Sequence, residues 1–201
     1  MKHFRMGLRV AAGLAFISIA GGIAAGCGSD DTDDPLNQQT QTPVGAEDQD
    51  RIDKGLAMSP VILNLNGLDR NLVGLGSYIV NAQAACNDCH TNPPFSSGSN
   101  PYQGQVEQIN TANFLAGGMT LAPNIVSTNL TPDGQGLPGG MTFEVFLARM
   151  RTGQKEDGSI LQIMPWPVYA KMRDDDLRAV YEYLRAIPHA EPGTVAPPTP
   201  P

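Results

Sequence analysis

Basic residues are scarce in this chain of 201 residues: 13 Lys and Arg stand against 20 Asp and Glu, a formal net charge of -7. The chain therefore lacks a broad basic surface that would neutralise phosphates, which excludes nucleic acid as an expected partner. Aromatic residues make up only 6% and there are three cysteines, so a disulfide framework cannot be the main source of stability. The length allows one modest domain with flexible ends, and a bound cofactor would supply core that the sequence lacks.

The first 26 residues have the form of an export signal. Lys2, Arg5 and Arg9 precede an uncharged, largely apolar run over residues 10–26. All acidic residues follow this run, so removal of the signal leaves 10 basic against 20 acidic residues, a formal charge of -10. The run of 17 residues is at the lower edge of what spans a bilayer, so a retained membrane anchor is the alternative.

The end of the signal, residues 23–27, resembles a bacterial lipobox in which Cys27 becomes the lipid-modified first residue. Lipoboxes more often carry Leu in place of Ala24, so cleavage by the ordinary signal peptidase is the alternative. Two or more acyl chains on Cys27 would be enough for stable anchoring. The sequence thus predicts an exported protein, held by lipid on the periplasmic face of a bacterial membrane.

Composition divides the rest of the chain into one domain with a tail on either side. Residues 27–55 are rich in Asp, Gln, Thr, Gly and Pro, and are predicted to form a disordered tether. The folded domain is predicted over residues 56–190. Residues 191–201 are predicted to form a loose, Pro-rich tail.

Three helices are predicted within the domain. The first carries an apolar stripe at helical spacing behind Asp69, a suitable N-cap. The second covers residues 142–152 and stops at Gly153. The third begins at Asp174 and ends before Pro188.

No run of residues alternates convincingly as a strand, and residues 91–140 are rich in Gly, Pro, Asn and Ser, which predicts a long loop. Gly76 would let the last helix cross the first at close range, with Tyr181 as the side chain opposite.

The chemistry is concentrated in Cys86, Cys89 and His90, which form a Cys-x-x-Cys-His motif. Two thiols at this spacing can reach the two vinyl groups of one haem, and the following imidazole then lies beneath the iron. The alternatives are a disulfide between Cys86 and Cys89, or half of a zinc site for which the domain offers only His189 or an acid as a further ligand.

The second iron ligand is predicted by elimination among the methionines that follow the signal. Met164 is favoured because Pro165 and Pro167 restrict the backbone around it and so lower the cost of ordering its thioether. Met119 is the runner-up.

The haem motif and four further segments together resemble a bacterial single-haem cytochrome c, and more narrowly the cytochrome c domains that serve periplasmic alcohol and gluconate dehydrogenases. The further segments are residues 77–80, 129–133, 143–153 and 164–167, and the final helix also matches. The resemblance covers roughly residues 70–188. It implies an all-α, cytochrome c-like fold of about three to five helices around one covalently bound haem c.

The resemblance also bears on single residues. It is consistent with Met164 as the axial ligand, and it suggests that the Trp166 indole donates a hydrogen bond to a haem propionate, the alternative being that Trp166 covers the haem edge. Independently of the resemblance, two interpretations of Pro93 and Pro94 have equal weight: one of their carbonyls accepts a hydrogen bond from His90, or the two prolines only shape a turn.

Axial ligation by His90 and Met164 would fill both iron positions and raise the reduction potential, which favours one-electron transfer over catalysis. The predicted function is therefore a periplasmic electron carrier, not an enzyme, between a dehydrogenase and a downstream cytochrome or terminal oxidase. The alternative is a haem enzyme or gas sensor with an open or labile sixth site. A third hypothesis is a zinc or disulfide module without haem.

Overall fold

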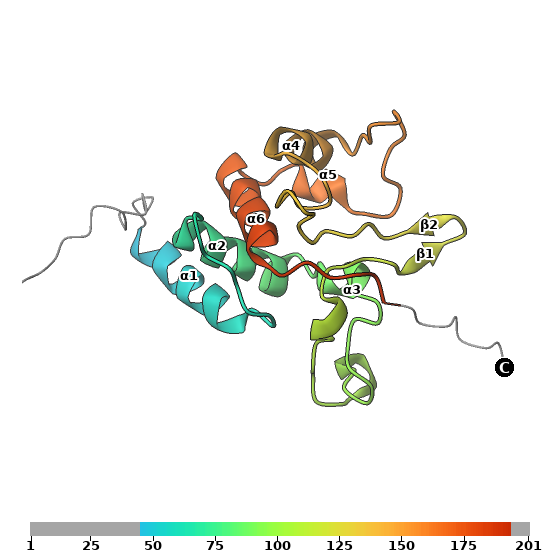
Figure 1. Cartoon of the computed structure of the whole chain (residues 1–201), viewed down its shortest axis with the longest axis horizontal. Helices are drawn as coiled ribbons and strands as arrows, with labels where there is room; N and C mark the ends of the chain where they lie inside the picture. The colour runs from blue at the N-terminus through green and yellow to red at the C-terminus, as the bar shows by residue number, and fades with distance from the viewer. Residues whose placement is uncertain (1–44, 194–201) are drawn as a thin grey trace, which may run out of the picture. The chain divides into compact units, whose positions relative to one another are not determined.

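The structure is a computed structural model that describes residues 45–193. The predicted signal, Cys27, the first part of the tether and the end of the Pro-rich tail lie outside these residues. The described part is mostly helical, with one small β-hairpin (Figure 1), which is consistent with a cytochrome c-like fold. Within it, no helix has the length and apolar character needed to cross a membrane.

Six α-helices occur in the described residues, one more than the upper number expected, and two of them are single turns. In chain order the elements are α1 (Ala46–Met58), α2 (Arg70–Tyr78), a π-helical turn (Ile79–Gln83), α3 (Asn87–His90), two 3-10 turns (Pro101–Gln103 and Thr111–Asn113), β1 (Thr120–Ala122), β2 (Ile125–Val126), α4 (Phe143–Thr152), α5 (Trp166–Tyr169) and α6 (Asp174–Ala186).

All three predicted helices are confirmed, and their ends follow local chemistry. The Asp69 carboxylate accepts hydrogen bonds from the first backbone N–H groups of α2, as an N-cap does. Helix α4 stops at Gly153, whose φ of 68° is the left-handed conformation that favours glycine. Helix α6 begins with three aspartates, whose charge complements the positive end of the helix dipole.

Helix α1 corrects the prediction of a disordered tether for residues 46–55. It begins ten residues before the predicted domain boundary and packs on α2. Ile52 is only 1% exposed, and the backbone of Gly55 lies directly against Gly74. Because Ile52 is the only large apolar residue in the first part of this helix, composition alone indicated disorder. The helix is stabilised by its packing partner.

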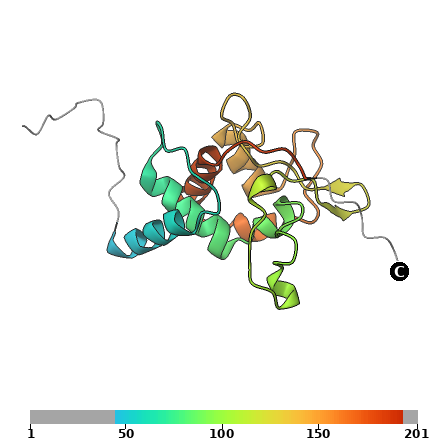
Figure 2. The ribbon, with the colours of Figure 1, turned by 60° about the horizontal axis from the view of Figure 1, so that its bottom comes forward.

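Helix α2 lies between α1 and α6, as Figures 1 and 2 both show. A Cβ atom on Gly76 would overlap the carbonyl group of Ala179 and lie 2.8 Å from the Cβ atom of Tyr183. The predicted close crossing of these two helices at Gly76 is therefore confirmed.

The prediction that Tyr181 is the side chain opposite Gly76 is wrong. Ala179 and Tyr183 are four residues apart and share the face of α6 that meets α2, whereas Tyr181 lies on another face. Its ring packs 5.4 Å from Phe143 and 5.5 Å from Phe146, and its hydroxyl donates to the carbonyl of Met141. Tyr181 thus joins α6 to α4.

The hairpin β1–β2 corrects the expectation that the domain has no strand. Thr120 pairs with Val126 and Ala122 with Ile125 in an antiparallel register. The turn between the strands contains Asn124 with a φ of 64°, a conformation that asparagine tolerates better than most residues. Both strands are too short to show a recognisable alternation in the sequence.

The start of the predicted loose tail is bound to the domain. Side-chain amides of two asparagines donate to its backbone, Asn113 to the carbonyl of Glu191 at 2.8 Å and Asn92 to that of Gly193 at 3.1 Å, and Asn129 donates to the carbonyl of Ala190, the residue just before it, at 2.9 Å. The chain after α6 therefore ties together loop segments that are far apart in the sequence.

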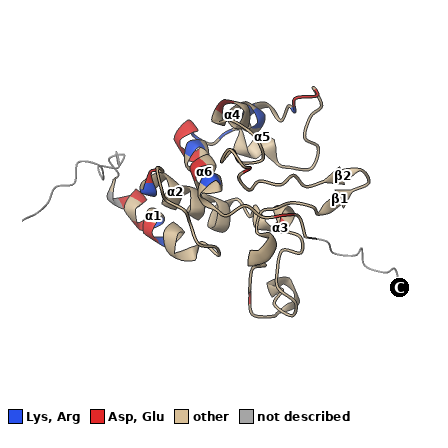
Figure 3. Ribbon diagram, viewed as in Figure 1, with Lys and Arg blue, Asp and Glu red and all other residues tan. Residues whose placement is uncertain are grey.

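Charge is distributed unevenly over the described residues. Residues 108–132 contain no Asp, Glu, Lys or Arg. Figure 3 accordingly shows the hairpin without charged residues, whereas α1, α6 and the loop after α4 carry both signs. The hairpin and the loop around it therefore contribute only neutral side chains to their surroundings.

Replacement of Gly76 by Ala tests the packing of α2 against α6. Alanine favours a helix over glycine by about 1 kcal/mol, but the added methyl group would meet the backbone of Ala179, which cannot move as a flexible side chain would. We expect the free energy of unfolding of the Gly76→Ala protein to fall by about 1–3 kcal/mol in chemical denaturation. Gly134→Ala is the matched control, because a Cβ atom there meets nothing within 4 Å. Equal stability of the two variants would contradict this packing.

Candidate functional site

The Cys-x-x-Cys-His motif is held in one helical turn. The π-helical turn Ile79–Gln83 ends just before it, and the motif begins at Cys86 and enters α3. The backbone N–H of His90 donates to the carbonyl of Cys86 at 2.9 Å. Cys89 and His90 follow Cys86 by three and four positions, a spacing at which each lies near the side chain of Cys86 on the turn. Cys86 and Cys89 are free thiols, the first half-buried and the second exposed.

The surroundings of Cys86 are apolar. Burial raises the pKa of the Cys86 thiol to about 12, and the neighbouring Cys89 acts in the same direction. Burial likewise raises the pKa of Tyr169 to about 12, and this side chain lines the same cavity as Cys86. This part of the site disfavours charged groups. A binding surface for the apolar part of a cofactor would have the same property.

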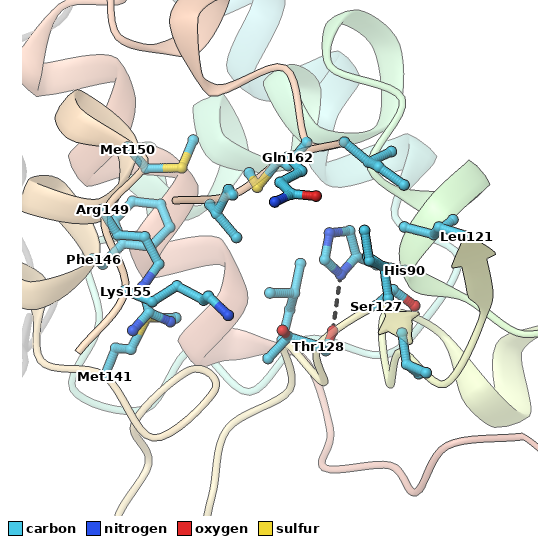
Figure 4. Close-up of a pocket in the computed structure, with 16 residues that line it drawn as sticks. His90, Leu121, Ser127, Thr128, Met141, Phe146, Arg149, Met150, Lys155 and Gln162 are labelled. Carbon is cyan, nitrogen blue, oxygen red and sulfur yellow. Dashed lines mark hydrogen bonds between the residues drawn. The ribbon is translucent and has the colours of Figure 1, made fainter. Parts of the chain in front are cut away.

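His90 is oriented by a residue of the long loop. Its Nδ1 atom lies 2.8 Å from the carbonyl oxygen of Thr128 (Figure 4), and a carbonyl oxygen only accepts, so Nδ1 carries the hydrogen. The lone pair is then on Nε2, the nitrogen free to bind a metal. Burial lowers the pKa of His90 despite the opposing effect of the hydrogen bond to Thr128, which favours the neutral imidazole that a metal requires.

The expectation that Pro93 or Pro94 orients His90 is therefore wrong. The carbonyl of Pro93 accepts from the side chain of Asn110 at 3.0 Å, and that of Pro94 accepts from the side chain of Asn87 at 3.2 Å. The two prolines shape the loop that follows α3. Thr128 lies 38 residues beyond His90, and nothing local to the motif indicates it.

Gly117 lies between the backbones of His90 and Thr128. Its N–H donates to the carbonyl of His90 at 2.6 Å, and a Cβ atom on it would lie 2.6 Å from the carbonyl oxygen of Thr128. With a φ of 72°, Gly117 has the left-handed conformation that side chains rarely adopt. A residue without a side chain is therefore needed here to keep the acceptor of His90 in place.

Two adjoining cavities lie beside the motif and bring Cys86, His90 and Met164 to one region. The first has about 740 Å³ of empty space, including space open to solvent, and His90 and Met164 line it. The second has about 460 Å³, and Cys86 and Met164 line it. The residues that line both cavities are Leu130, Phe146, Met150 and Met164.

The methionines considered as a second ligand differ in how they lie relative to the two cavities. Met164 is half-buried and lines both cavities, whereas Met119 lines neither. Met141 lines the first cavity and Met150 lines both, but these two side chains are buried within the hydrophobic core, and Met172 lines only the second cavity. Met164 belongs instead to a short segment that precedes α5, and it packs against the edge of the core while lining both cavities.

Trp166 lies close to the site without lining either cavity. Its indole N–H donates to the carbonyl of Leu161 at 3.2 Å, and its ring packs directly on Gly153. Trp166 therefore joins the end of α4 to the segment that leads to Met164.

His189, the expected further ligand of a zinc site, has both ring nitrogens engaged away from the cysteines. Nδ1 lies 2.9 Å from the carbonyl of Pro132, and Nε2 lies 3.0 Å from the carboxylate of Glu191. Within residues 45–193, no three His, Cys, Asp or Glu side chains gather as a group that would hold a metal ion.

The site fits a covalently bound haem. Two thiols would bond to the vinyl groups, an imidazole with Nε2 available and a thioether would be the iron ligands, and the cavity walls are mainly apolar. In addition, the Nε atom of Arg149 is buried without a hydrogen-bond partner among the described residues, and this side chain lines the first cavity. A buried donor of this kind suits a cofactor that brings its own anionic groups.

No protein-family model matches the chain. It is 32% identical over 117 residues to the cytochrome c subunit of the quinone-dependent alcohol dehydrogenase of Gluconobacter oxydans, a match that covers 58% of this chain and 21% of the relative. The fructose dehydrogenase cytochrome subunit of Gluconobacter japonicus and the gluconate 2-dehydrogenase cytochrome c subunit of Pantoea cypripedii are also 32% identical, over 57% and 56% of this chain and 21% and 22% of the relatives.

The chain thus spans about a fifth of the length of the relatives that it matches. The matched stretch nevertheless confirms the resemblance recognised in the sequence, and over more than half of its length this chain is homologous to the cytochrome c subunits of dehydrogenases.

Proposed function

We propose that this protein is a lipid-anchored periplasmic cytochrome c that carries one electron on a single haem c with His90 and Met164 as axial ligands. The observation that supports this most is the arrangement of Cys86, His90 and Met164 around adjoining apolar cavities, with His90 held by Thr128. One Cys-x-x-Cys-His motif in the sequence corresponds to one haem.

The haem supplies the Fe(II)/Fe(III) couple, and the chain supplies attachment, orientation and a dry environment. Cys86 and Cys89 attach the group. Thr128 keeps the His90 ring in one tautomer and one orientation, so little rearrangement accompanies a change of iron charge. Phe146 and Leu130 line both cavities and would keep water from the bound group. With both axial positions filled, the site favours electron transfer over substrate binding.

A dehydrogenase is the proposed electron donor, and a downstream cytochrome or terminal oxidase the acceptor. The support for a dehydrogenase is that the three relatives are named as cytochrome subunits of alcohol, fructose and gluconate dehydrogenases. The proposed anchor at Cys27 would keep this carrier at the membrane near such partners.

Removal of both attachment thiols tests covalent haem binding. We expect the Cys86→Ala, Cys89→Ala protein, made in a host that attaches c-type haem, to lose haem that survives denaturing gel electrophoresis. The Cys27→Ser protein is the control, because it lacks the third cysteine and should keep the haem. Covalent haem in the double variant would contradict the proposed attachment.

The same Cys27→Ser protein tests the anchor. Without the thiol no lipid can be attached, so we expect the protein to move from the membrane fraction to the soluble periplasmic fraction. The measurement is haem staining of separated fractions, with the unaltered chain processed in parallel. A variant that stays in the membrane fraction would point to a retained signal helix instead.

Replacement of Met164 by Leu tests the second axial ligand. We expect the ferric protein to lose its weak far-red thioether-to-iron absorption band, the reduction potential to fall, and the ferrous protein to bind carbon monoxide. Met119→Leu is the matched control and should retain the band, because Met119 lines neither cavity. Carbon monoxide binding by the unaltered protein would instead favour a haem enzyme or gas sensor with a labile sixth site.

A further inference from the structure

Two cations face the proposed haem cavity in a chain that has few of them. Arg149, in the last turn of α4, and Lys155, in the loop that follows, both line the first cavity. Among the described residues that line this cavity, none is acidic. The wall opposite, from Leu121 to Leu130, belongs to the uncharged stretch of the sequence, so it offers no counter-charge to either cation.

Arg149 is only partly satisfied by the protein. Its side chain is 19% exposed, and its Nε atom is buried without a hydrogen-bond partner among the described residues. The nearest acid is Glu156, 3.6 Å from Nη2, with a side chain that is 80% exposed. An ion pair of this length with a solvated carboxylate contributes little to stability. The buried Nε–H of this guanidinium therefore still lacks an acceptor among the described residues, although the side chain lines the cavity.

Lys155 is placed by its loop. Its backbone N–H donates to the carbonyl of Ser159 at 2.8 Å, and its backbone carbonyl accepts from the N–H of Gly158 at 3.0 Å. These two hydrogen bonds form a tight turn. Figure 4 shows its side chain extending into the cavity from the wall that carries Arg149 and Phe146. Its nearest acid, Asp157, is 3.7 Å away and solvent-exposed.

The two cations lie apart from the attachment end of the site. Cys86 lines the second cavity and not the first, whereas Arg149 and Lys155 line the first and not the second. In a haem, the vinyl groups and the two propionate groups occupy opposite edges of the porphyrin. Cys86 and these cations are thus separated as the two edges of one haem require.

We propose that Arg149 and Lys155 bind the haem propionates, an inference that rests on the proposed haem. An ionised carboxylate in a mainly apolar cavity requires a charged or hydrogen-bonding partner. The guanidinium of Arg149 can donate two parallel hydrogen bonds to one propionate, and Lys155 supplies a point charge for the other. Trp166 supports this arrangement from outside, because it fixes the segment from Gly153 to Leu161 that contains Lys155.

This arrangement has a consequence for electron transfer. Reduction lowers the positive charge on the iron, so a nearby cation stabilises the ferrous form relative to the ferric form. Arg149 and Lys155 would therefore raise the reduction potential, in the same direction as the thioether of Met164.

The test is the reduction potential of the full haem-loaded protein, measured at constant ionic strength. We expect Arg149→Gln and Lys155→Met each to lower the equilibrium constant for reduction on the order of tenfold, which is about 59 mV for a one-electron couple. Arg149→Lys retains the charge and should stay near the potential of the unaltered protein. Arg173→Gln and Lys171→Met remove the same charges from exposed positions outside the cavity, and are the matched controls.

The outcomes separate this inference from the proposed function. If Arg149→Gln and Lys155→Met keep covalent haem and shift the potential no more than their controls, the propionate assignment is wrong while the electron carrier stands. Absence of covalent haem from the unaltered protein would contradict the proposed function itself. If Arg149→Gln does not fold, Lys155→Met, on an exposed turn, still decides the question.

Discussion

The hydrogen bond from His90 Nδ1 to the carbonyl oxygen of Thr128 joins segments 38 residues apart and leaves Nε2 as the imidazole nitrogen that can bind a metal. The proposed site depends on it, because a ring free to rotate would not present Nε2 to one place. Gly117 contacts both backbones, and it has no side chain that would push the acceptor away. The long loop after the motif is therefore part of the site, and its conformation is as important as that of the helices.

The rest of the fold stabilises this arrangement from two sides. On one side α1, α2 and α6 pack through glycines, so the turn that carries Cys86 starts from a rigid base. On the other side the chain after α6 accepts hydrogen bonds from Asn113 and Asn129, which brackets the loop that contains Thr128. A mostly helical domain thus positions a site whose wall is formed largely by loop and a short hairpin.

Apolar and charged side chains are found in different parts of the site. The region of Cys86 is apolar enough to raise the pKa of its thiol to about 12, whereas Arg149 and Lys155 face the other cavity. A haem has the same asymmetry, apolar over most of its surface and anionic at one edge. This match between the chain and the cofactor extends the argument for haem beyond the attachment motif.

The amino-acid sequence by itself determined the features that depend on neighbouring residues. The ends of α2 and α4 were predictable because Asp69 and Gly153 act on backbone groups within one helical turn, and the start of α6 because Asp174 places negative charge at the positive end of the helix dipole. The spacing of Cys86, Cys89 and His90 is likewise local. Tertiary structure alone decided which residues meet across long stretches of sequence.

Helix α1 needed α2 as a packing partner, Tyr183 rather than Tyr181 met the close crossing at Gly76, and Thr128 rather than a nearby proline met His90. The physical reason is that such contacts form between loops and between crossing helices. The periodicity of the sequence does not indicate which residue of one segment will contact which residue of another.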